Sequence, residues 1–210
     1  MNELAVRTVT GVVLIAAVLL AAIQGGNIFA MLVAAIATLM FYEWTRIVRG
    51  WGAAWYLGGF IYALLPALAL LWIREREDQG LALLMWTFIV TWATDIGAYF
   101  VGRAFGRAKL APSISPGKTV AGLYGGVAAA TILAGGWAWF ADLKPAMYAL
   151  APLFALAAQG GDLFESWMKR RAGVKDSGHW LPGHGGLLDR LDGLVPVATL
   201  TAIAQMAGVA

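Results

Sequence analysis

The chain has 210 residues, of which 60% are hydrophobic and 13% charged, and its formal net charge is +3. A soluble domain is about 45–50% apolar, and the excess here comes as long apolar runs. A separate soluble domain is therefore excluded, and an integral membrane protein is predicted. The chain contains no cysteine, which excludes disulfides and thiolate metal sites.

Seven apolar segments are each long enough to cross about 30 Å of hydrocarbon as a helix. They cover residues 8–23, 28–46, 54–73, 81–101, 120–140, 146–168 and 194–210. Helices are required because lipid offers no partner for free backbone groups. We expect an all-α polytopic membrane protein, with residues 1–80 as N-terminal spans and residues 81–210 as the catalytic region of a single membrane domain. We expect the first span to be retained, because residues 21–23 give no clear signal-peptide cleavage site.

The loops between these segments differ strongly in basic charge. When the loops are taken alternately, 12 of the 15 Lys and Arg residues fall on the same side of the membrane as the N-terminus. Because positive charge accumulates in cytoplasmic loops, we expect the N-terminus and both large basic loops to face the cytoplasm.

Two acids, Asp95 and Asp162, lie inside apolar segments. A charged residue at mid-bilayer costs about 2.5–3.5 kcal/mol on insertion scales, so such residues are usually paired or functional. Ser166, Lys169 and Arg170 follow Asp162 at spacings that place them on the same helix face. Gly160 and Gly161 precede it, which lets another backbone or a ligand approach closely. A salt bridge that ties helices together explains the two acids about as well as a functional site does.

The first large basic loop, residues 102–119, combines four basic residues with glycine, proline and hydroxyl side chains. Phosphate oxygens accept hydrogen bonds from these groups. The spacing is not that of a nucleotide P-loop. A basic patch on anionic lipid is the alternative, but it does not predict the interleaved Gly, Ser and Pro, so the loop favours phosphate binding. Its candidate phosphate ligands are Arg103, Ser113, Ser115, Lys118 and Thr119.

The second basic stretch, residues 166–192, carries ten ionisable side chains among its 27 residues. Residues 182–186 are too rich in glycine for regular structure. Asp189 and Asp192 follow at i, i+3, and together with Asp162 they are hard oxygen ligands suited to Mg²⁺. We interpret His184 as a phosphate or loop hydrogen-bond donor rather than as a metal ligand, because the chain has too few histidines for a zinc site.

This stretch resembles the signature of the phosphatidate cytidylyltransferases, or CDP-diacylglycerol synthases. The matching residues read Ser166-x-Met168-Lys169-Arg170-x4-Lys175-Asp176-x-Gly178-x-x-Leu181-Pro182-x-His184-Gly185-Gly186-Leu187-x-Asp189-Arg190-Leu191-Asp192. The upstream run Asp95-x-Gly97-Ala98-Tyr99-x-x-Gly102-Arg103 is also similar to the family, as is Ser113-x-Ser115-Pro116-x-Lys118-Thr119.

The resemblance implies the reaction of CTP with phosphatidic acid to give CDP-diacylglycerol and pyrophosphate, a step of phospholipid biosynthesis. It implies Mg²⁺ as the cofactor and allows a second, monovalent cation such as K⁺. It also implies a homodimer in the cytoplasmic (inner) membrane, with the active site facing the cytoplasm and no nucleic acid as a partner. The catalytic residues would be Asp162, Lys169, Arg170, Lys175, Asp176, Asp189 and Arg190, of which Lys169, Arg170, Lys175 and Arg190 would hold phosphates. The family's metal ligands would map onto Asp162 and Asp189, and to these we add Asp192. The phosphates of CTP and of the lipid would contact Arg103, Ser113, Ser115, Lys118, Thr119, Ser166, His184, Gly185 and Gly186.

Three other classes of protein remain open. A transporter for an anionic substrate would also use buried acids and glycine-interrupted helices, but it predicts acids near the midplane and matching inverted halves. A nucleotidyltransferase or kinase acting on another lipid phosphate or on a polyprenol would keep the same reaction chemistry with a different acceptor. A membrane anchor would have no use for the three acids.

Overall fold

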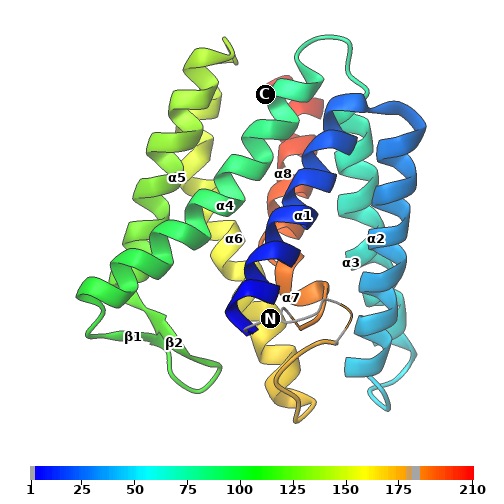
Figure 1. Ribbon diagram of the computed structural model, residues 1–210, viewed down its shortest axis with the longest axis vertical. Coiled ribbons are helices and arrows are strands. Elements are labelled where there is room, and N and C mark those ends of the chain that lie inside the picture. Colours follow the sequence, from blue (N-terminus) through cyan, green and yellow to red (C-terminus); the bar gives the residue numbers. More distant parts are fainter. Residues whose placement is uncertain (1–2, 179, 181–184) are drawn as a thin grey trace.

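The computed structural model describes residues 3–178, 180 and 185–210, and side chains within them from residue 8 onward. In these ranges the chain forms eight helices and one two-stranded sheet. Seven helices are long and run side by side as one bundle (Figure 1). They are α1 (Glu3–Gln24), α2 (Gly26–Ile47), α3 (Ala53–Arg74), α4 (Gly80–Phe105), α5 (Val120–Phe140), α6 (Ala146–Arg171) and α8 (Leu194–Met206).

Two short features occur at one end of this bundle. Strands β1 (Lys109–Ala111) and β2 (Ser115–Thr119) form an antiparallel hairpin between α4 and α5. The four-residue helix α7 (Leu188–Leu191) precedes α8. The hairpin, α7, the end of α6 and the start of α1 all lie at this end, whereas the C-terminus and the α3–α4 connection lie at the opposite end (Figure 1). The all-α prediction therefore describes the bundle and misses the hairpin, whose pairing depends on contacts across a turn rather than on an apolar run.

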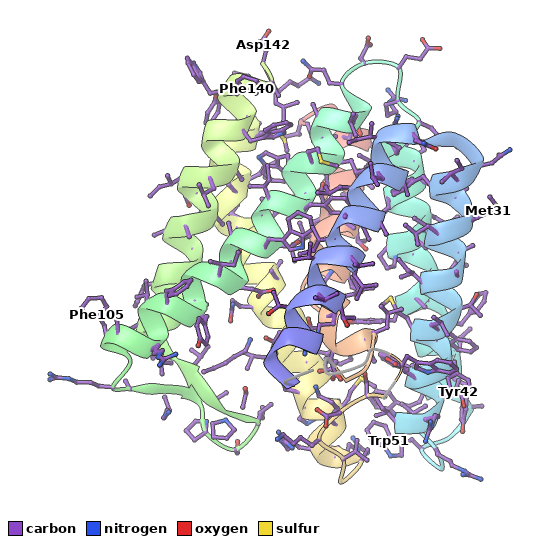
Figure 2. All side chains as sticks on the ribbon, viewed as in Figure 1. Met31, Tyr42, Trp51, Phe105, Phe140 and Asp142 are labelled. Carbon is purple, nitrogen blue, oxygen red and sulfur yellow. The ribbon has the colours of Figure 1, made fainter. Side chains whose placement is uncertain are left out.

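Four helices of the described chain, α2, α3, α4 and α5, are long and apolar enough to cross a membrane. The apolar stretches in α1 and α8 are shorter, Thr8–Gln24 and Leu194–Met206. Large apolar side chains point outward from the bundle, including Met31, Phe105 and Phe140, which are 65%, 73% and 75% exposed (Figure 2). An apolar outer surface of this kind is stable in lipid rather than in water. The predicted seven crossings are thus supported for four helices by length and composition.

Helices α4 and α5 approach each other closely through small residues. Gly97 faces the backbone of Gly125, and a side chain at Gly125 would collide with Val101. Gly126 and Ala130 are buried on the same face of α5. From the sequence, this small-residue face could pack closely against a helix, including one of a second copy of the chain in a homodimer. In the structure the face is used inside one chain, so the homodimer stays a prediction that rests on the family resemblance.

Candidate functional site

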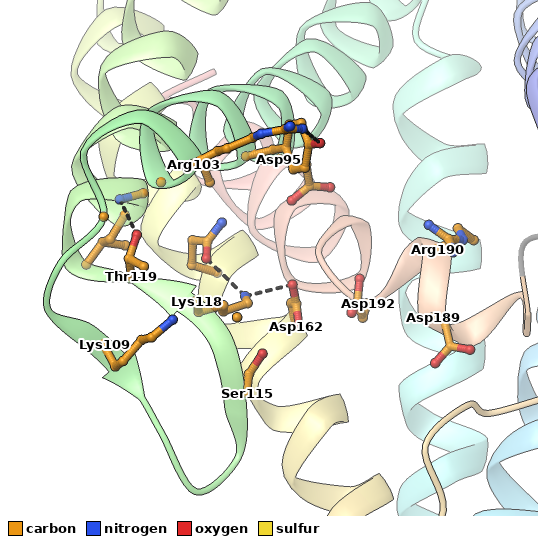
Figure 3. Close-up of a pocket in the computed structure, with 18 residues that line it drawn as sticks. Asp95, Arg103, Lys109, Ser115, Lys118, Thr119, Asp162, Asp189, Arg190 and Asp192 are labelled. Carbon is orange, nitrogen blue, oxygen red and sulfur yellow. Dashed lines mark hydrogen bonds and ion pairs between the residues drawn. The ribbon is translucent and has the colours of Figure 1, made fainter. Parts of the chain in front are cut away.

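A cavity of about 640 Å³ opens at the hairpin end of the bundle. Its walls come from the hairpin and from α4, α5, α6 and the α7–α8 turn (Figure 3). Its charged lining residues are four cations and four acids: Arg103, Lys109, Lys118, Arg190, Asp95, Asp162, Asp189 and Asp192. The sequence motifs that are far apart in the chain therefore meet around one space.

Asp162 and Lys118 connect the hairpin to α6 on one wall of this cavity. The Lys118 Nζ lies 2.7 Å from Asp162 Oδ2 and donates a hydrogen bond of 3.0 Å to Gln159 Oε1. Ser166 Oγ donates to Asp162 Oδ1 at 3.3 Å, one helical turn further along. The ion pair fixes the carboxylate and the ammonium at the cavity surface, where the side chain of Asp162 keeps 31% of its exposure.

Thr119 ends the hairpin and begins α5. Its side chain accepts a hydrogen bond from the Gly122 amide at 3.0 Å, which is an N-cap that satisfies one free donor of the helix. Thr119, Ser115 and Arg103 line the cavity, and Arg103 donates to the Tyr99 hydroxyl at 2.9 Å. Ser113 is exposed at the hairpin turn and does not line the cavity.

Asp192 lies in the turn between α7 and α8 and is 9% exposed. Burial raises its pKa well above the usual range, and the negative charge of Asp162 raises it further. A bound cation would relieve both effects, because it would offset the two negative charges at once. Asp162 and Asp192 lie next to each other at the cavity, and Asp189 lies beyond Asp192 (Figure 3).

Asp189 is already surrounded by donors. Its carboxylate accepts hydrogen bonds from the amides of Ser177 and Gly186, each at 3.0 Å, and from Lys169 Nζ at 2.5 Å. Burial acts to raise its pKa, but the hydrogen bonds that it shares with Glu165 and Lys169 outweigh burial and hold the pKa below its usual value. Among the residues that the structure describes, no three His, Asp or Glu side chains are grouped so as to hold a metal ion. The predicted trio of Asp162, Asp189 and Asp192 is therefore not brought together as one ligand set.

Several predicted catalytic residues and phosphate ligands occupy other positions. Lys169 lies between Glu165 and Asp189, 2.5 Å from an oxygen of each, and does not line the cavity. Arg170 donates to the backbone oxygen of Ile114 at the hairpin turn at 3.2 Å. Lys175 and Asp176 are exposed outside the cavity. The Gly186 amide is used by Asp189, Gly185 lies beside the same carboxylate, and His184 lies outside the described residues.

Four polar residues around the site were not among the predicted site residues. Asp95 and Gln159 line the cavity, and Glu43 and Glu165 are buried, at 0% and 1% exposure. Each is a polar side chain within an apolar helix, which is the signal that identified Asp162. That signal singles out Asp95 in the sequence as well, and when it is applied to every such residue it also finds Gln159, Glu43 and Glu165.

Fold and cavity together define a helical membrane protein with a mixed cationic and acidic site at one end of its bundle. The chain belongs to the cytidylyltransferase family, which it matches over residues 49–207. A phosphatidate cytidylyltransferase of Brucella suis is 49% identical over 174 residues, which are 80% of this chain and 62% of the relative. Phosphatidate cytidylyltransferases of Bacillus subtilis and Pseudomonas aeruginosa are 48% and 39% identical, over 57% and 76% of this chain and 46% and 60% of the relatives. The chain thus spans about three fifths of the length of the first of these relatives.

Proposed function

We propose that this chain transfers the cytidylyl group of CTP to phosphatidic acid, giving CDP-diacylglycerol and pyrophosphate. The observation that carries the proposal is the cavity at the hairpin end, where Arg103, Lys109, Lys118 and Arg190 face the same space as Asp162 and Asp192. A volume of about 640 Å³ falls within the range of about 300–1,000 Å³ that is usual for small-ligand sites. Family membership and the names of the relatives support this substrate pair.

The reaction joins two anions. A phosphate oxygen of the lipid attacks the α-phosphorus of CTP, the bond to the β-phosphate breaks, and pyrophosphate leaves. The lipid phosphate is already ionised near neutral pH, so no strong general base is required. Positioning and charge neutralisation supply most of the rate. The four cations of the cavity are suited to hold phosphate oxygens. Gly102, Gly106 and Gly117 also line the cavity, and their lack of a side chain lets a ligand approach closely.

Mg²⁺ is the cofactor that fits this donor set. It is commonly held by one or two carboxylates together with the phosphates of the substrate, and Asp162 and Asp192 supply two neighbouring carboxylates. Asp189 lines the same cavity but is satisfied by Lys169 and two amides. Bound there, Mg²⁺ would offset negative charge on the phosphates. A second, monovalent cation such as K⁺ remains part of the proposal on the strength of the resemblance alone.

We further propose that all seven long helices cross the bilayer and that the cavity faces the cytoplasm, where CTP is available. The helices run between the same two ends of the bundle (Figure 1), and the basic residues of the hairpin and of the end of α6 lie at the end that holds the cavity. This arrangement follows the rule that positive charge stays on the cytoplasmic side. It also lets the acyl chains of the lipid remain in hydrocarbon while the headgroup reaches the site.

The test is to incubate the purified protein in detergent with radiolabelled CTP, phosphatidic acid and Mg²⁺. A lipid-soluble cytidine product together with released pyrophosphate is expected. Preference for a polyprenol phosphate or another lipid phosphate would preserve the reaction class and reject the acceptor. CTP binding without any turnover on lipid phosphates would reject the proposed function.

A further inference from the structure

Glu43 is a carboxylate inside an apolar helix that the proposed reaction does not use. It lies near the end of α2 and is completely buried. Its Oε1 accepts a hydrogen bond from the Leu187 amide at 3.0 Å, and its Oε2 accepts from the Leu188 amide at 2.7 Å and from Ser177 Oγ at 2.9 Å. One side chain of α2 therefore connects Ser177, in the segment between α6 and α7, to the two amides at the start of α7.

Asp189 contacts the same segment, because it accepts hydrogen bonds from the amides of Ser177 and Gly186. Ser177 belongs to both sets of contacts, because its amide donates to Asp189 and its hydroxyl donates to Glu43. The packing leaves no room for further atoms, since a side chain at Gly186 would collide with Ser177 Oγ and lie 2.8 Å from Glu43 Oε2. A side chain at Gly178 would likewise collide with Glu43. The two carboxylates thus form one connected network with the segment.

The burial of Glu43 lowers the stability of the fold, which suggests that the carboxylate is kept for a functional reason. Burying a carboxylate costs free energy, which hydrogen bonds to its oxygens offset only in part. Two of the three donors are backbone amides at the start of α7, and these amides would have other acceptors, including water, in a looser loop. What the carboxylate adds is a fixed position for the start of α7. That short helix and the turn after it carry Asp189, Arg190 and Asp192, all of which line the cavity.

We propose that Glu43 is a positioning residue of the active site, which fixes α7 so that Asp189, Arg190 and Asp192 face the cavity. The span α2 is then part of the functional unit rather than a membrane anchor for a site built elsewhere. Glu43 precedes residues 49–207, which match the family. The kinetic part of the inference rests on the proposed cytidylyltransferase function, whereas the structural part does not.

The experiment compares Glu43→Gln with Glu77→Gln, an exposed glutamate in the α3–α4 connection at the opposite end of the bundle. Glutamine keeps the size of the side chain but offers one acceptor oxygen in place of two, so at least one amide of α7 loses its partner. Hydrogen exchange of the peptides that cover residues 185–192 is measured in detergent, together with kcat and KM for CTP and the thermal unfolding midpoint. Ser177→Ala, which removes only the hydroxyl contact, is the milder second variant.

For Glu43→Gln we expect exchange in residues 185–192 to rise at least tenfold and kcat, per folded protein, to fall at least tenfold, with KM for CTP changed less than threefold. Ser177→Ala should show smaller changes in the same direction, and Glu77→Gln should match the parent. The proposal is overturned if exchange stays at the parental rate in both Glu43→Gln and Ser177→Ala. It is also overturned if Glu43→Gln lowers the midpoint while the folded fraction keeps the parental kcat. If the parent itself makes no cytidine lipid, the proposed function fails, and the exchange measurement alone decides the role of Glu43.

Discussion

Lys169 allows a sharp test, because the sequence and the structure give it different roles. The family signature implies a phosphate ligand, whereas the structure places the ammonium 2.5 Å from oxygens of both Glu165 and Asp189. The three side chains are 11%, 2% and 10% exposed. The change that separates the two roles is Lys169→Met, which keeps most of the length of the side chain and removes its charge.

The structure sets the size of the expected effect. Removing one partner of a buried ion pair leaves an uncompensated charge and costs about 3–5 kcal/mol. Here Asp189 and Glu165 lose the ammonium that lies between them, so we expect a cost within that range. In a chain of this length each kcal/mol lowers the unfolding midpoint by about 2–4 °C. The midpoint of Lys169→Met should therefore fall by about 6–20 °C.

The assay is thermal unfolding in detergent, followed by the fluorescence of the ten tryptophans. Lys175→Met is the matched control, because Lys175 is exposed in the next segment of the chain, and its midpoint should stay within about 2 °C of the parent. A Lys169→Met protein that unfolds at the parental midpoint but has lost turnover would refute our reasoning and return Lys169 to the phosphate-binding set.

Three further outcomes are expected. Asp162→Asn should lower Mg²⁺-dependent turnover at least about 100-fold. It should leave the unfolding midpoint within about 3 °C of the parent, because the ion pair of Asp162 with Lys118 is partly exposed and is worth about 0–1 kcal/mol. Normal turnover would contradict the metal assignment. Gly161→Ala should destabilise the protein by about 1–3 kcal/mol, since its side chain would collide with the Asp192 carbonyl. Gly160→Ala should instead stabilise the protein by about 0.5–1 kcal/mol, because the added methyl group has no neighbour within 4 Å. Equal unfolding midpoints for the two variants would reject the close α6–α8 packing. Chelation with EDTA should abolish turnover, and Mg²⁺ should restore it; turnover that survives chelation would exclude the metal.

The helices were predictable because the signal for each is local. An apolar run predicts residues 120–140, and α5 is Val120–Phe140. The run at residues 54–73 predicts α3, which is Ala53–Arg74. Lipid leaves such runs only one way to satisfy their backbone, so no information from the rest of the fold is needed.

The partners of the charged residues were not predictable to the same degree. The charges of Lys169, Asp189 and Lys118 are visible in the sequence, but which of them pair with each other depends on how α6, α7 and the hairpin pack. The helical spacing correctly puts Ser166 next to Asp162, one turn away. It carries no information on contacts such as Glu43 with Leu188, which lie 145 residues apart.

The charge balance of the cavity links the site to the need for a cation. Its four cations are matched by four acids, and one of the acids, Asp189, is already satisfied by Lys169 from outside the cavity. The surplus of positive charge that remains is too small for a nucleoside triphosphate, which carries about four negative charges near neutral pH. A nucleoside triphosphate bound here would therefore need cations of its own, and the acids that would repel its phosphates are the groups able to hold those cations. Lys118 is paired with Asp162, so its ammonium is free to bind phosphate oxygens only when a bound cation replaces it at that carboxylate. Lys118→Met should accordingly tighten the binding of Mn²⁺, used as a probe, in the absence of nucleotide and weaken CTP binding. A variant that weakens both, or neither, would show that the ion pair and the metal site are independent.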